Sequence, residues 1–150
     1  MTAARAASDA SRIAAFMGLP RAGSMDDLAL VDSVQKGFPA RTAAIVAKRI
    51  DPEGRYLDPT RIVPRSTLSR RLKAGEPLSR EESERILALS RVFTEVLRIY
   101  GGDTERATRF LEKPHPLLGG RSPMAVAIGS IAGADLVLKL LEKADAGIAA

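Results

Sequence analysis

The amino-acid sequence predicts an all-α protein in which an N-terminal helix-turn-helix half is joined by one long helix to a C-terminal helical domain. Residues that cap helices recur along the whole chain. Apolar residues follow many of these caps at helical spacing, and no segment alternates apolar and polar residues for the length of a strand. With 150 residues, of which 45% are hydrophobic, the chain can bury a core. It would do so either as one domain or as two small helical domains that share one core.

Two helices are predicted before the most basic segment of the chain. The first begins at Asp26-Asp27, whose carboxylates suit the positive end of a helix dipole, and stops at Gly37, a residue that tolerates a left-handed cap. The second begins at Phe38-Pro39, with the proline in its first turn, and continues to Ile50. We expect the Ala- and Ser-rich residues 1–16 to form a frayed extension.

A short helix, a tight turn and a second, basic helix come next. Asp58-Pro59 predicts the start of the short helix, which Pro64 ends. We expect Ser66 to cap the second helix, which runs from Thr67 to Ala74, and Gly75 to end it. These are the ingredients of a helix-turn-helix, whose second helix enters the major groove of DNA.

The positive charge of the chain is concentrated in the same region. Residues 1–75 hold 13 basic and 7 acidic residues, a net charge of +6, whereas residues 76–150 hold 10 and 11, a net charge of −1. The segment from Arg61 to Gly75 has several basic residues and no acid, which favours nucleic acid because each Lys or Arg at a phosphate releases counterions. The alternative is an ordinary helical hairpin with a basic, solvent-exposed face. The candidate DNA-binding residues are Arg65, Ser66, Thr67, Ser69, Arg70, Arg71 and Lys73.

The longest predicted helix begins at a capping box. Ser79 is followed three residues later by Glu82, so that each side chain can bond the backbone N–H of the other residue. Apolar residues then recur at helical spacing from Ile86 to Tyr100, and Gly101-Gly102 ends the helix. We expect this helix to be buried and to join the two halves of the chain.

Three shorter helices are predicted in the second half. Asp103 caps the first of them, which Pro114-His115-Pro116 stops, and Ser122-Pro123 starts the next. The paired Gly119-Gly120 is no phosphate-binding loop, because no strand precedes it and no third glycine is correctly placed, so it predicts a close approach between packed helices. Asp135 opens the last helix. The expected buried face of that helix consists of Leu136, Val137, Leu140 and Leu141.

The composition argues against several classes of enzyme and binding protein. Without cysteine there is no disulfide framework and no cysteine-ligated metal site. One histidine, His115, is too few for a typical zinc enzyme, and its place between two prolines indicates an exposed loop residue rather than a catalytic base. An aromatic content of 4% without Trp argues against binding single-stranded nucleic acid by stacking. We therefore predict a protein that is not an enzyme and needs neither cofactor nor metal.

No targeting or membrane segment is predicted. The N-terminal residues lack the apolar centre of a secretory signal. The most apolar window, Pro123–Leu141, is interrupted by glycines and charged residues and does not predict a membrane span. We expect a cytoplasmic protein without a membrane partner.

Several short motifs follow one another along residues 13–150. They are Gly18-Leu19-Pro20, Gly37-Phe38-Pro39, the segments Pro64–Arg71 and Leu78–Arg85, Phe110–Pro114, Leu118–Pro123 and a closing Gly147. In their order and spacing they resemble the Xre-type antitoxins of RES–Xre toxin–antitoxin pairs, which belong to the MbcA/ParS/Xre antitoxin family of type II systems.

The resemblance implies an all-helical antitoxin with three parts. Residues 1–25 would be a partly flexible extension, residues 26–78 a helix-turn-helix region for DNA binding and dimerisation, and residues 79–150 a toxin-binding domain. Such antitoxins bind as homodimers to the operator of their own operon. Their partner is a RES-domain toxin that consumes NAD, and the antitoxin's C-terminal end covers the NAD-binding cleft of that toxin. Carried over to this sequence, the toxin-binding residues are Gly119, Gly120, Arg121, Lys143, Gly147, Ile148, Ala149 and Ala150.

Some positions depart from the family pattern. Phe110 stands where the family often has Trp, and Ala144 and Ala146 replace larger residues. Lys143 stands where Arg is usual, and Lys lacks the planar fork with which Arg grips a carboxylate or phosphate.

Two alternatives belong to other functional classes. One is a free-standing helix-turn-helix transcriptional regulator whose second half dimerises or senses a ligand. The other is a structural helical module whose basic face has no nucleic-acid partner.

Overall fold

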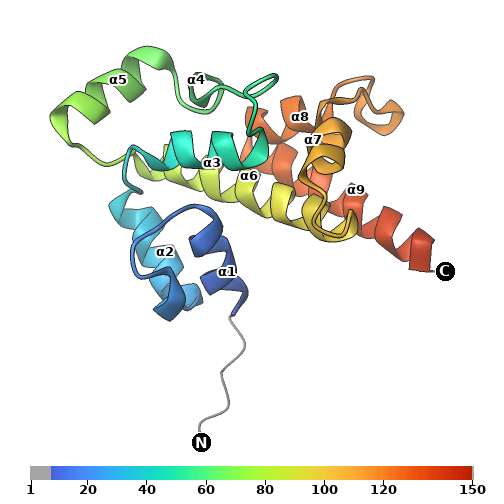
Figure 1. Cartoon of the computed structure of the whole chain (residues 1–150), viewed down its shortest axis with the longest axis horizontal. Helices are drawn as coiled ribbons and strands as arrows, with labels where there is room; N and C mark the ends of the chain where they lie inside the picture. The colour runs from blue at the N-terminus through green and yellow to red at the C-terminus, as the bar shows by residue number, and fades with distance from the viewer. Residues whose placement is uncertain (1–7, 150) are drawn as a thin grey trace, which may run out of the picture.

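The structure, a computed structural model, describes residues 8–149, with side chains up to Asp145. All regular elements in these residues are helical, so the predicted all-α class is confirmed (Figure 1). The elements are α1 (Asp9–Phe16), the 3₁₀ helix η1 (Ala22–Ser24), α2 (Asp27–Lys36), α3 (Thr42–Ile50), α4 (Pro59–Ile62), α5 (Arg65–Ala74), α6 (Arg80–Ile99), α7 (Thr104–Glu112), the 3₁₀ helix η2 (Pro116–Leu118), α8 (Pro123–Gly129) and α9 (Ile131–Ala149).

The long helix α6 runs through the middle of the molecule (Figure 1). It packs against α1, α2, α3 and α4 of the first half and against α7, α8 and α9 of the second. The capping box predicted for its start is present: Ser79 Oγ accepts the Glu82 N–H at 3.1 Å, and the Ser79 N–H donates to Glu82 Oε1 at 2.8 Å. Its apolar stripe is buried in a core that takes residues from both halves.

Helix α1 was not predicted, and the expectation of a frayed extension is wrong for residues 9–16, which form a helix packed on the core. The cap of this helix is visible in the sequence. Ser8 accepts the N–H of Ser11, and the helix buries Ile13, Ala14 and the following Met17. Phe16 stacks on Phe93 of α6 with ring centroids 5.6 Å apart. A helix of eight residues is marginal in isolation, so the stability of α1 depends on its packing against η1, α6 and α2.

Helix α2 begins and ends where the sequence predicted, and α3 begins later. Asp26 caps α2 by accepting the Ala29 N–H at 2.8 Å. Pro39 lies in a turn rather than in the first turn of α3, because the Thr42 N–H donates to the Pro39 carbonyl and the regular helix starts only at Thr42. The prediction of a helix from Phe38-Pro39 was therefore early by one turn.

The basic segment folds as the four-residue α4 followed by the ten-residue α5. Asp58 caps α4 by accepting the Thr60 N–H at 2.8 Å. Ser66 does not cap α5, which starts at Arg65 directly after Pro64 and has no side-chain cap. Gly75 ends α5 in the left-handed conformation, as predicted. Because α4 is a single turn, the helix-turn-helix geometry remains a prediction.

The second half closes around α6. Asp103 and Ser122 cap α7 and α8 as predicted. Helix α9 begins at Ile131, four residues before Asp135, because the Ser130 hydroxyl accepts the Gly133 N–H at 2.9 Å and so serves as its cap. Val137 and Leu141 are buried as predicted, but Leu136 is 49% exposed. None of the helices in the described residues has the length and apolar character that crossing a membrane requires.

Candidate functional site

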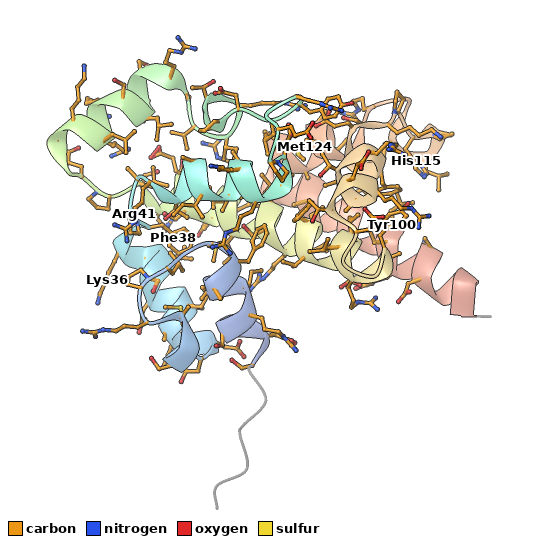
Figure 2. All side chains as sticks on the ribbon, viewed as in Figure 1. Lys36, Phe38, Arg41, Tyr100, His115 and Met124 are labelled. Carbon is orange, nitrogen blue, oxygen red and sulfur yellow. The ribbon has the colours of Figure 1, made fainter. Side chains whose placement is uncertain are left out.

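The first candidate surface is the outer face of α5. This helix lies at one end of the molecule, and nitrogen-ended side chains extend outward from it (Figure 2). Its buried residue is Leu68. Most of the predicted DNA-binding residues are exposed here, and Thr67 is half-buried. The exposed ones are Arg65, Ser66, Ser69, Arg70 and Lys73, which we call the basic face.

The basic face has little acidic compensation. No Asp or Glu lies within α5, and Arg70 approaches one carboxylate, that of Glu76, at 3.8 Å in an exposed pair. Such an exposed pair contributes little stability and is readily exchanged for another anion. The arrangement therefore presents cationic groups that a phosphate backbone can engage without disrupting the fold.

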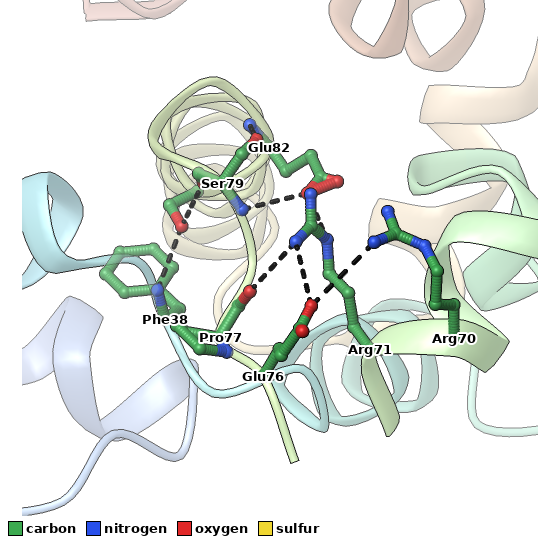
Figure 3. Close-up of polar contacts among 8 residues, drawn as sticks. Phe38, Arg70, Arg71, Glu76, Pro77, Ser79 and Glu82 are labelled. Carbon is green, nitrogen blue, oxygen red and sulfur yellow. Dashed lines mark hydrogen bonds and ion pairs between the residues drawn. The ribbon is translucent and has the colours of Figure 1, made fainter. Parts of the chain in front are cut away.

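Arg71 occupies different surroundings from the other predicted residues of α5. Its side chain is only 18% exposed and turns toward the start of α6 (Figure 3). Its Nε lies 2.8 Å from Oε1 of Glu82 in an ion pair whose N–H does not align as a hydrogen bond, and its NH1 group donates to the Pro77 carbonyl at 3.3 Å. Arg71 therefore contacts α6 and the linker before it.

The second candidate surface includes the loop between α7 and α8. The loop closes on itself: the His115 N–H donates to the Arg121 carbonyl at 3.1 Å, and the Gly120 N–H donates to the His115 carbonyl at 3.1 Å. Gly119 and Gly120 adopt φ of 65° and 79°, and a Cβ at either would meet no atom within 4 Å. The predicted close helix–helix approach is wrong here, because these glycines supply a left-handed backbone for the turn.

His115 stabilises this loop. Its Nδ1 accepts the Leu117 N–H at 3.1 Å, and its ring stands edge-on to Phe110 with centroids 6.5 Å apart. The residue is half-buried rather than exposed as predicted. Arg121 is exposed, and its Nε donates to the Leu118 carbonyl at 3.3 Å.

The end of α9 completes the second surface. The last turns of α9 project beyond the body of the molecule, at the same end as the α7–α8 loop and opposite α5 (Figure 1). Lys143 is exposed on this helix. Gly147, Ile148 and Ala149 lie within the helix, whereas Ala150 lies outside the described residues.

An exposed ion-pair bridge connects α6 to the last part of α9. Arg98 of α6 donates from NH2 to Glu95 at 2.6 Å and to Asp145 of α9 at 2.7 Å. The hydrogen bonds with Glu95 and then Asp145 raise the pKa of the Arg98 guanidinium above its ordinary value. Arg98 therefore links α6 to α9 near the base of the projecting segment through an exposed ion pair.

The second half also exposes apolar side chains that the sequence did not predict to be exposed. Leu117 is 75% exposed beside the Gly119-Gly120 turn, and Ile131 and Leu136 in the first half of α9 are 42% and 49% exposed. Large apolar side chains in contact with water are common at binding surfaces. The sequence offered only an apolar pattern, which does not reveal which of two neighbouring leucines, Leu117 or Leu118, faces the core.

Comparisons with known proteins agree with this architecture. A family model of the antitoxin Xre/MbcA/ParS C-terminal toxin-binding domain matches residues 96–147, from the last turn of α6 into α9. The chain is also 33% identical over 115 residues to a protein of Yersinia enterocolitica serotype O:8 / biotype 1B (strain NCTC 13174 / 8081) named Antitoxin Xre; the match covers 74% of this chain and 77% of that protein. The resemblance predicted from the motifs is confirmed, and the chain belongs to the Xre antitoxin family of toxin–antitoxin systems.

Proposed function

We propose that this antitoxin acts at two separate surfaces. With residues 143–150 and the α7–α8 loop it covers the NAD-binding cleft of a RES-domain toxin, and with α5 it binds operator DNA and represses its own operon. The observation that carries the proposal is the placement of the basic face and of the projecting end of α9 at opposite ends of the molecule (Figure 1). Both partners can therefore be bound at once.

The toxin-binding part of the proposal is supported by shape. Residues 146–149 continue helix α9, which the buried Val137 and Leu141 anchor to the core. A helix end that is anchored at its base loses less conformational entropy on binding than a free tail does. Blocking a cleft requires no reaction by the antitoxin, so the proposed role is non-enzymatic inhibition.

The DNA-binding part is supported by charge and exposure. The basic face gathers three exposed cations, Arg65, Arg70 and Lys73, on a helix that protrudes from the fold (Figure 1). A homodimer formed by residues 26–78 would present two such helices to a two-fold operator. The same proposal divides the chain into an extension (residues 1–25), a DNA-binding and dimerisation region (26–78) and a toxin-binding domain (79–150). It also places the action of the protein in the cytoplasm. Membership in an antitoxin family favours this function over the free-standing regulator.

Deletion of Ile148–Ala150 tests the toxin-binding part. The full-length and shortened chains are mixed with the purified RES-domain toxin of the same operon, and NAD consumption is measured. We expect the shortened chain to leave the toxin active while it retains affinity for a labelled duplex of the DNA upstream of the operon. Undiminished inhibition of the toxin would contradict the covering role of this segment.

The substitution Arg70→Ala tests the DNA-binding part. We expect it to weaken binding to the same duplex and to make the plot of log K against log salt less steep by about 0.9 per lost phosphate contact. Arg109→Ala is the matched control, because it removes an equally exposed arginine from α7 in the other half. Equal affinity and slope for the two variants would show that α5 does not bind DNA.

A further inference from the structure

The junction between α5 and α6 is built around a partly buried ion pair. Arg71 comes from the last turn of α5, and its partner Glu82 is the third residue of α6, with a side chain only 8% exposed (Figure 3). The Arg71 NH1 group also donates to the Pro77 carbonyl in the linker and lies 4.0 Å from Glu76. One guanidinium therefore approaches Glu76 and Pro77 of the linker as well as Glu82 of α6.

Other contacts of α5 with the core are few. Leu68 is the buried residue of the helix, and Leu72, one turn later, is 53% exposed. The linker becomes buried only at Leu78, whose N–H donates to the Phe38 carbonyl at 2.8 Å. Between Leu68 and Leu78, the contacts of Arg71 with Glu82 and Pro77 are the partly buried polar link between α5 and α6.

We propose that Arg71 is a positioning residue that locks α5 to α6, and that it does not contact DNA. This inference rests on the proposed DNA-binding function of α5, which requires the basic face to be held at a fixed angle. The Nε and NH1 groups of Arg71 face Glu82 and Pro77, and its side chain is only 18% exposed, so a phosphate contact that drew the guanidinium outward would separate it from the nearly buried Glu82 carboxylate. An ionised carboxylate left unpaired in such a place is costly, so the guanidinium stays with it.

The substitution Glu82→Gln separates the two possible roles of Arg71, because they predict opposite effects. Gln preserves the capping box but removes the charge that holds Arg71. If Arg71 positions α5, then in the Glu82→Gln variant α5 occupies its DNA-binding position for a smaller fraction of the time than in the wild type. If only about one tenth of the molecules hold α5 in that position, the apparent affinity for DNA falls about tenfold. If Arg71 is a phosphate contact, its release and the loss of a negative charge would strengthen binding.

The experiment uses the full chain and the labelled upstream duplex, with salt titrations of the wild type and of the variants Glu82→Gln, Arg71→Gln and their double mutant. Glu81→Gln is the control, since it makes the same charge change one residue away at an exposed side chain. We expect Glu82→Gln and Arg71→Gln each to lower affinity with the wild-type salt slope. The double mutant should bind no worse than either single variant, because all three have lost the same contact. Stronger binding by Glu82→Gln, or a reduced salt slope in Arg71→Gln, would overturn the inference.

Hydrogen exchange distinguishes failure of this inference from failure of the DNA-binding proposal. In the Glu82→Gln chain we expect the backbone amides of residues 69–74 to exchange about tenfold faster than in the wild type, while those of α7 and α8 keep their wild-type rates. A wild-type chain that does not bind the duplex would contradict the proposed function alone. Wild-type exchange rates in α5 of both the Glu82→Gln and Arg71→Gln variants would contradict the positioning role of Arg71, whether or not the chain binds DNA.

Discussion

Among the glycines that the structure describes, Gly37 and Gly133 lie nearest to a backbone carbonyl oxygen of another segment, so that a side chain at either position would collide with it. A Cβ at Gly37 would lie 1.9 Å from the Leu78 oxygen, and one at Gly133 would lie 2.1 Å from the Val126 oxygen. Each glycine thus allows close packing of two segments. At Gly37 the segments are distant in sequence, and at Gly133 they are the consecutive helices α8 and α9. At Gly37 the contact joins the α2–α3 linker to the α5–α6 linker, next to the hydrogen bond that the Leu78 N–H donates to Phe38.

Replacing Gly37 with Ala should destabilise the fold severely. The residue has a φ of 88°, which an L side chain rarely adopts, and the added methyl group would collide with a carbonyl that is itself fixed. We expect a loss of about 3 kcal/mol or more in the free energy of unfolding, measured by urea denaturation. Gly54→Ala is the control, because its φ of 66° brings strain without a neighbouring atom, and should cost about 1 kcal/mol. Similar losses for the two variants would show that the close contact at Gly37 is not rigid.

Asp51 makes stability depend on pH. Its burial, the largest single effect, raises the pKa. The N–H groups of Tyr56 and Leu57, which donate to Oδ2 at 2.5 and 2.9 Å, lower it together with the N–H and charge of Arg55, so that the pKa lies below its ordinary value of 3.8. Folding therefore favours the ionised form, and this stabilisation is present above the ordinary pKa and lost as the pH falls through the lowered one.

The variant Asp51→Asn should be less stable than the wild type by about 1–2 kcal/mol at pH 7, because a neutral amide oxygen accepts these two hydrogen bonds more weakly. We expect the difference in the free energy of unfolding between the two chains to shrink as the pH is lowered from 5 toward 2. Urea denaturation across that range measures it. A difference that stays constant would mean that the Asp51 carboxylate does not contribute through its charge.

At the scale of the helices, the sequence predicted best those boundaries that local hydrogen bonds determine. Asp26, Ser79 and Asp103 cap their helices with side chains that reach only three residues ahead, so the pattern is visible in the sequence. The start of α3 and the exposure of Leu136 depend on how distant segments pack, which periodicity does not reveal. Likewise, nothing in the sequence distinguished Arg71 from Arg70, because the Glu82 that holds Arg71 is brought near only by the course of the linker.

The cap at Ser79 should carry measurable stability. Ser79→Ala removes the oxygen that accepts the Glu82 N–H and should lower the free energy of unfolding by about 1 kcal/mol. Ser66→Ala should leave it nearly unchanged, since that serine is exposed and does not cap α5. Thermal unfolding followed by circular dichroism compares the two variants. A larger loss for Ser66→Ala would contradict the observed start of α5.

At the scale of the whole molecule, α6 makes the two halves share one core. The same helix packs against α1, α2 and α3 of the first half and against α8 and α9 of the second. The sequence left open one domain or two small domains with a common core. The continuous set of buried side chains across both halves is typical of a single cooperative unit, so proposed functions at the two ends would depend on one folding equilibrium.

Truncation of Phe93 tests this cooperativity. The side chain is buried in α6 and stacks on Phe16 of α1, so Phe93→Ala leaves a cavity on the side of the first half. We expect a loss of about 3–5 kcal/mol in the free energy of unfolding. If the core is one unit, the slowest-exchanging amides of α8 and α9 should lose protection by the same free energy as those of α3. Hydrogen exchange measured residue by residue decides between the two cases. Unchanged protection in α8 and α9, with loss confined to α1–α3, would mean that the toxin-binding half folds independently of the basic half.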